Sequence, residues 1–178
     1  MGKEAKLMRT WTKALVYLGV FAVLHFLFDL THWPFLAPFC GVNESVFQHL
    51  KMAFWAYLVA SVVEGVAGKR SVRDKAAFWY SRLASAVVVP WLVLLLWYVA
   101  PALVGRIEHM AVELLWATVV TYLSGIMGGM WDKHLERATP ALGFRLCVIG
   151  LVIVSTVLYV RFTYKLPWLG LFVDPRGI

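Results

Sequence analysis

One short stretch, GVNESVFQHLKM at residues 41–52, places six polar residues in an otherwise apolar chain. It brings a carboxylate, an imidazole and an ammonium group together at Glu44, His49 and Lys51. Imidazole with carboxylate is a ligand set for zinc, or for iron or manganese where oxygen ligands dominate. The stretch is therefore a candidate metal site.

Two further sets of polar residues have helical spacing. His25, Asp29 and His32 are four and three residues apart, so on a helix they would share one face. His109 and Glu113 are again four residues apart. Histidine and carboxylate pairs on two helices, with a histidine on a third, can surround one ion or one water molecule.

The composition indicates what positions these groups. The chain has 178 residues, of which 61% are hydrophobic and only 15% charged, with nine tryptophans, whereas soluble domains carry about 25% charged residues. This balance predicts a multi-pass membrane protein. The net charge of +7 does not indicate nucleic-acid binding, because no basic run is interleaved with aromatic residues.

We predict an all-α fold, an integral membrane bundle of five transmembrane helices forming one domain over residues 1–178. Five apolar segments are long enough to span the hydrocarbon, and Pro90 lies in the middle of the third. Small residues in the segment GIMGG of the fourth favour close helix packing. The helices are expected at about 11–32, 44–64, 76–99, 106–130 and 141–164, with an interfacial tail over 165–178.

The basic residues predict the orientation. Twelve of the seventeen fall on one side of a five-span bundle, which by the positive-inside rule is cytoplasmic. The N-terminus is then cytoplasmic and the C-terminus outside. The twelve are Lys3, Lys6, Arg9, Lys13, Lys69, Arg70, Arg73, Lys75, Arg82, Lys133, Arg137 and Arg145.

In this orientation the polar groups fall at similar depths in the outer leaflet. At 1.5 Å per residue, His49 lies about 8 Å along the second helix and His25 roughly 12 Å from the end of the first. His109 and Glu113 lie roughly 5–10 Å into the fourth. The predicted metal ligands are His25, His49 and His109, with Asp29 or Glu113 as ligand or general base, and Asn43, Glu44, Ser45 and Lys51 as the cofactor-binding and orienting set.

Structural roles compete with this site. Asn43 and Ser45 are good N-cap residues, and Ser45 with Gln48 matches a capping box. Glu44 suits the dipole of a helix N-terminus. Lys51 either extends to the outer interface or pairs with Asp29 or Glu44.

Other polar residues have simple structural interpretations. The His25–Asp29 and His109–Glu113 pairs would stabilise helix packing, and His32 would be interfacial. Asp132 and His134 are expected in solvent, and Glu64 in an interfacial ion pair with Lys69 or Arg70. Cys40 and Cys147 fall at opposite ends of predicted helices, so no disulfide is expected between them.

The segment HFLFDLTHWPFLAPF and the stretch GVNESVFQHLK after it resemble a family of small prokaryotic multi-pass membrane proteins of unknown function. That family's motif reads P-V-N-E-S, three residues, H, then L-K. Asn43, Glu44, Ser45, His49 and Lys51 match it over a region of about residues 24–58, whereas Gly41 stands in place of the proline. The resemblance implies the plasma membrane of a prokaryote and supports the same site, but it implies no activity.

The leading hypothesis is a metal-dependent hydrolase, with zinc the first candidate, that acts on a lipid or lipid-linked substrate. Its partners would be membrane lipids, with no nucleic acid. A non-catalytic accessory subunit of a larger membrane complex, such as a respiratory one, is the rival. A b-type haem protein using His25 and His109 is a third hypothesis. Ion or proton conduction ranks last, because only Glu64 offers polarity in the inner half of the bundle.

Overall fold

The computed structural model describes residues 8–68, 74–105, 107, 109–138 and 140–174. These residues form five long α-helices and no strand, which confirms the all-α prediction. All five helices are long and apolar enough to cross a membrane. They are α1 (Thr10–Thr31), α2 (Val46–Ala67), α3 (Lys75–Val104), α4 (Met110–Arg137) and α5 (Leu142–Tyr164), with the short 3-10 helices η1 (Pro34–Leu36) and η2 (Gly170–Phe172).

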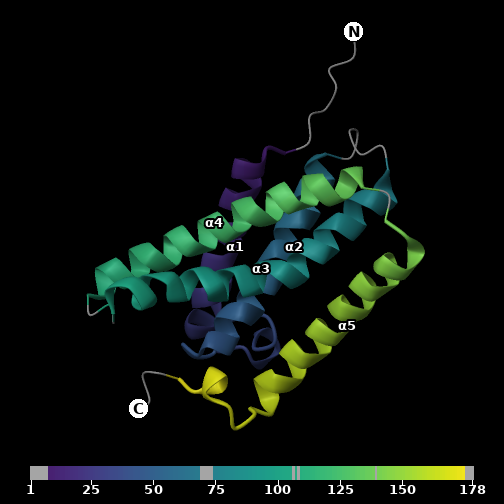
Figure 1. Cartoon of the computed structure of the whole chain (residues 1–178). Helices are drawn as coiled ribbons and strands as arrows, with labels where there is room; N and C mark the ends of the chain where they lie inside the picture. Colours follow the sequence, from purple (N-terminus) through teal and green to yellow (C-terminus); the bar gives the residue numbers. More distant parts are fainter. Residues whose placement is uncertain (1–7, 69–73, 106, 108, 139, 175–178) are drawn as a thin grey trace.

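The first four helices form a bundle in which α2 packs against α1 and α3, and α4 packs against α3 and α1. The last helix, α5, lies outside this bundle along α3 (Figure 1). Burial follows the same order, since 56% of the most apolar part of α2 is buried but only 6% of that of α5. The central position of α2 matters because this helix carries His49 and Lys51.

The α3–α4 hairpin is longer than the sequence predicts. α3 has 30 residues and α4 has 28, against 22 for both α1 and α2. At 1.5 Å per residue the hairpin helices exceed the other two by roughly 9–12 Å. The end of α3 and the beginning of α4 accordingly lie away from the α1–α2 connection (Figure 1). α3 continues through Pro90 as one helix.

The glycines of α4 allow the close packing that the GIMGG segment predicts. A Cβ atom on Gly125 would lie 2.6 Å from Cδ1 of Tyr17, and one on Gly128 would lie 2.6 Å from Cγ2 of Val89. No side chain fits at such distances without displacing its neighbours. The packing role of this segment is therefore confirmed, and the middle of the bundle is tightly filled.

A buried ionic network joins four helices at the end of the bundle where α1 begins. Lys13 on α1 has its Nζ 2.9 Å from Glu64 Oε2 on α2 and 2.5 Å from Asp132 Oδ2 on α4. Arg82 on α3 has its Nη2 3.0 Å from Glu64 Oε1 and its Nη1 in contact with Glu136. Lys13, Glu64, Arg82 and Asp132 are all nearly inaccessible to solvent, so the network is part of the core.

Two predictions about this end of the bundle are wrong. Asp132 is 1% exposed rather than solvated, because α4 continues to Arg137 and turns Asp132 towards the bundle. The ion pair of Glu64 is buried and uses Lys13 and Arg82. The partners expected for Glu64 from the sequence, Lys69 and Arg70, lie outside the described residues. Several of the basic residues used to predict the orientation also lie outside them. His134 is exposed as predicted.

The segment after α5 folds back onto the bundle. Phe172 in η2 is buried, and its ring centroid lies 4.7 Å from that of Phe47 on α2 and 5.4 Å from that of Phe162 on α5. Trp168 remains 92% exposed. Only part of the predicted interfacial tail is therefore open to its surroundings. Cys40 and Cys147 are free thiols, as expected.

Candidate metal centre

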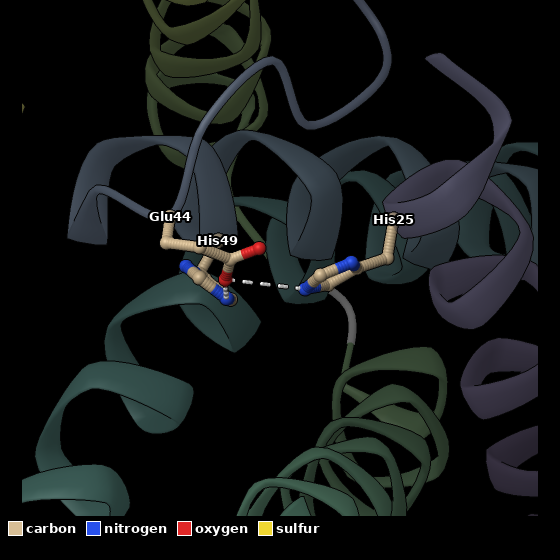
Figure 2. A group of neighbouring side chains, drawn as sticks. All are labelled: His25, Glu44 and His49. Carbon is tan, nitrogen blue, oxygen red and sulfur yellow. Dashed lines mark ion pairs between the residues drawn. The ribbon is translucent and has the colours of Figure 1, made fainter. Parts of the chain in front are cut away.

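Three of the predicted polar residues meet at the end of the bundle that holds the α1–α2 connection. His25 comes from α1, Glu44 from the connection and His49 from α2, and their side chains converge (Figure 2). Glu44 Oε2 lies 3.5 Å from His25 Nε2 and 3.5 Å from His49 Nε2. The three side chains are each about one quarter to one third exposed, so the group is accessible from outside.

These separations are those of two long ion pairs from Glu44 to the histidines, and they are also close to the distance between two ligands of one metal ion. Hydrogen bonds between nitrogen and oxygen are usually 2.7–3.2 Å long. Two ligands bound tetrahedrally to zinc at about 2.0–2.1 Å are roughly 3.3–3.4 Å apart. All three donor atoms lie within 4.8 Å of one another. Two histidines and one glutamate are also the ligands of one type of catalytic zinc site, in which the fourth position stays open.

The ring of His49 is oriented for binding through Nε2. Its Nδ1 lies 3.0 Å from the carbonyl oxygen of Ser45, which can only accept a hydrogen bond. Nδ1 therefore carries a proton that it donates to this carbonyl, and Nε2 faces Oε2 of Glu44. Metal-bound histidines usually have such a partner on their second nitrogen. The Nδ1 of His25 is buried and has no hydrogen-bond partner among the described residues.

The backbone of the α1–α2 connection brings Glu44 to the two histidines. α1 ends at Thr31, and its C-cap residue His32 has a positive φ of 52°, which ends the helix. The Gly41 N–H then donates to the Leu24 carbonyl at 3.1 Å. A Cβ on Gly41 would lie 3.0 Å from the sulfur of Met52, so a larger residue would require the end of the Met52 side chain to shift.

The start of α2 is capped differently from the prediction. Asn43 Oδ1 accepts the Ser45 N–H at 3.0 Å, which agrees with a turn-forming role for Asn43. Ser45 occupies the N-cap position, but its side chain makes no capping hydrogen bond. In the described part of the chain, the Ser45 hydroxyl and both amide atoms of Gln48 are buried without a partner. The predicted capping box is therefore not formed.

The structure does not bring His109 to the other two histidines. His109 precedes the first residue of α4, at the tip of the long hairpin, and is exposed. The group that could hold a metal ion, among the residues described, consists of His25, Glu44 and His49. Glu113 is exposed in the first turn of α4. His109 and Glu113 do not lie at the same depth as His25 and His49, because α3 and α4 are longer than α1 and α2.

Two other polar residues of α1 lie near the site but face outward. Asp29 is exposed one turn after His25, and His32 is exposed at the end of the helix. Of the three residues predicted to share one face of α1, only His25 contributes to the group with Glu44 and His49.

Lys51 is buried instead of interfacial. It is 0% exposed, and its Nζ donates to the Ala37 carbonyl at 2.6 Å and to the Thr163 hydroxyl at 3.2 Å. The prediction that it extends to the outer interface is wrong. Its position in the second turn of α2 directs it towards the connection and α5.

Sequence reasoning missed the charges at the other end of the bundle. From the sequence, Lys13 and Arg82 count only as cytoplasmic charges. Lys13 lies about one turn from the beginning of α1, and Arg82 lies about two turns from the beginning of α3. Ionisable residues within spanning helices usually face the bundle interior. That rule, applied to residues beside the helix ends, would have found them.

The five long apolar helices indicate a membrane protein, and among the described residues His25, Glu44 and His49 form the group that could hold a metal ion. The chain belongs to a family of unknown function, DUF6512, which matches residues 3–177. No curated protein and no solved structure matches it.

Proposed function

We propose that the protein is a metal-dependent hydrolase of a lipid or lipid-linked substrate, with zinc held by His25, Glu44 and His49. The observation that carries the proposal is the position of Glu44 Oε2, 3.5 Å from both Nε2 atoms. In this proposal Glu44 is a metal ligand instead of an orienting residue, and His109 is not a metal ligand. The ligand set leaves a fourth position open, where zinc lowers the pKa of bound water to about 7.

The surroundings of the site support an apolar substrate. Phe26 and Leu30 on α1, and Trp33 and Phe35 in the connection, are all more than half exposed. The rings of Trp33 and Phe35 stack with centroids 5.5 Å apart. A water-activating centre beside an exposed apolar surface suits a bond near the polar end of a lipid. Asp29, exposed one turn from His25, is the nearer candidate for general base.

Orientation and location complete the proposal. The positive-inside rule assigns the beginning of α1 to the cytoplasm, so the metal centre would lie in the outer leaflet. The motif resemblance suggests the plasma membrane of a prokaryote. Substrate would then enter from the outer leaflet along α1 and the α1–α2 connection.

Metal analysis of detergent-purified protein in chelator-free buffer tests the proposal. The wild type should carry about one equivalent of zinc, iron or manganese, and His49→Ala should lose it. His109→Ala is the matched control and should keep it, because His109 is exposed and outside the group. Absence of metal from the wild type would refute the proposal and favour the accessory-subunit hypothesis, in which the same residues only fix helix packing. A protein that keeps its metal in His49→Ala but loses it in His109→Ala would contradict the structure.

A further inference from the structure

The connection that carries Glu44 is fastened to α2 at two consecutive carbonyl groups. Lys51 Nζ donates to the Ala37 oxygen at 2.6 Å, and Trp55 Nε1 donates to the Pro38 oxygen at 3.1 Å. Lys51 and Trp55 are four residues apart and therefore project from the same side of α2. Glu44 lies six residues beyond Pro38 and directly before Ser45, the N-cap residue of α2.

The Thr163 hydroxyl fits the second hydrogen bond of Lys51. It donates its own proton to the Tyr159 carbonyl at 2.8 Å, so its oxygen is left to accept from Lys51 Nζ at 3.2 Å. Lys51 consequently joins the connection to the end of α5, a helix that otherwise lies along α3. Burying an ammonium group costs free energy unless its N–H groups find hydrogen-bond acceptors. Here the N–H groups of Lys51 donate to the backbone of the connection and to Thr163, and so hold the connection in place.

We infer that Lys51 is a positioning residue that holds the α1–α2 connection where Glu44 can stand between His25 and His49. It acts through the Ala37 carbonyl and does not touch the metal-binding group. The inference rests on the proposed function only in assuming that His25, Glu44 and His49 bind a metal. The position of the connection itself does not depend on a metal.

Cys40 is a natural reporter of this connection. It follows Ala37 by three residues and is fully buried. Burial raises the pKa of its thiol, and the nearby charge of Lys51 acts in the opposite direction. Removing only the charge of Lys51 would therefore raise the pKa further and slow the reaction of Cys40 with a thiol reagent. Releasing the connection would expose Cys40 and speed that reaction.

The experiment measures the rate at which N-ethylmaleimide labels Cys40 in a Cys147→Ser background, without added metal. Lys51→Met should speed labelling about 10- to 100-fold, the effect expected for a lost hydrogen bond from a charged donor. Lys165→Met is the matched control, since Lys165 is exposed at the end of α5, and it should label at the wild-type rate. Equal or slower labelling in Lys51→Met would overturn the inference.

A milder variant covers the case in which Lys51→Met does not fold. Trp55→Phe keeps an aromatic ring but removes the bond to Pro38, so it should also speed labelling, and an unchanged rate would overturn the inference. In the same variants the affinity for zinc should fall about 10- to 100-fold, as for other residues that orient ligands. If the wild type binds no metal, the proposed function fails, but the labelling rates still decide the role of Lys51.

Discussion

The buried ionic network predicts a large stability loss when its arginine is removed. Arg82 donates to both oxygens of Glu64, at 3.0 and 3.2 Å, and contacts Glu136. In Arg82→Met, the ammonium of Lys13 is left to neutralise Glu64 and Asp132 alone. Removing one partner from a buried charge pair costs about 3–5 kcal/mol. The unfolding equilibrium should therefore shift by roughly 150- to 4000-fold.

Reversible unfolding in mixed micelles, followed by far-UV circular dichroism, measures this change. Arg161→Met is the matched control, because Arg161 is exposed in the last turn of α5, and it should cost less than about 1 kcal/mol. Adding Glu64→Gln to Arg82→Met should recover part of the loss by removing the unpaired carboxylate. The reasoning would be refuted if Arg82→Met unfolded like the wild type, or if the double variant were no more stable than the single one.

Three further predictions concern packing, the unpaired amide and pH. Gly128→Ala should destabilise the bundle by about 1–3 kcal/mol through overpacking, whereas Gly150→Ala, with nothing within 4 Å, should be neutral or stabilising; thermal melts of the two variants check this. Gln48→Met should raise the melting temperature if the buried amide has no partner, and a fall would show that the amide binds water or ligand. Metal content measured after equilibration between pH 5 and 8 should fall as the pH drops, because His25 and His49 bind metal only when unprotonated; constant content across this range would contradict this expectation.

Hydropathy was sufficient to predict the five helices but not their lengths. The predicted ends of α1 and α5 differ from the observed ends by at most one residue. α3 continues to Val104 at its outer end because the segment after residue 99 is apolar, whereas α4 begins later than predicted, at Met110, and continues further at its inner end, to Arg137. This error in length is what misplaced His109 and Glu113.

Part of the site could be predicted because its residues are close in sequence or helical spacing. His49 and Glu44 lie within one motif, and His25 is the inward member of an α1 face. Rotation of a helix about its axis cannot be read from one sequence, so neither the outward position of Asp29 nor the burial of Lys51 was predictable. The network of Lys13 and Arg82 depends on contacts between four helices, which periodicity alone does not define.

X-ray absorption at the metal edge, on protein purified without chelators, tests the central claim most directly. We expect scattering from two imidazole rings and from oxygen ligands, with all bonds at about 2.0–2.1 Å for zinc. The Glu44→Gln variant should change the oxygen contribution and keep the imidazole scattering of His25 and His49. A first shell without imidazole, or one containing sulfur at about 2.3 Å, would contradict a centre built from His25, Glu44 and His49.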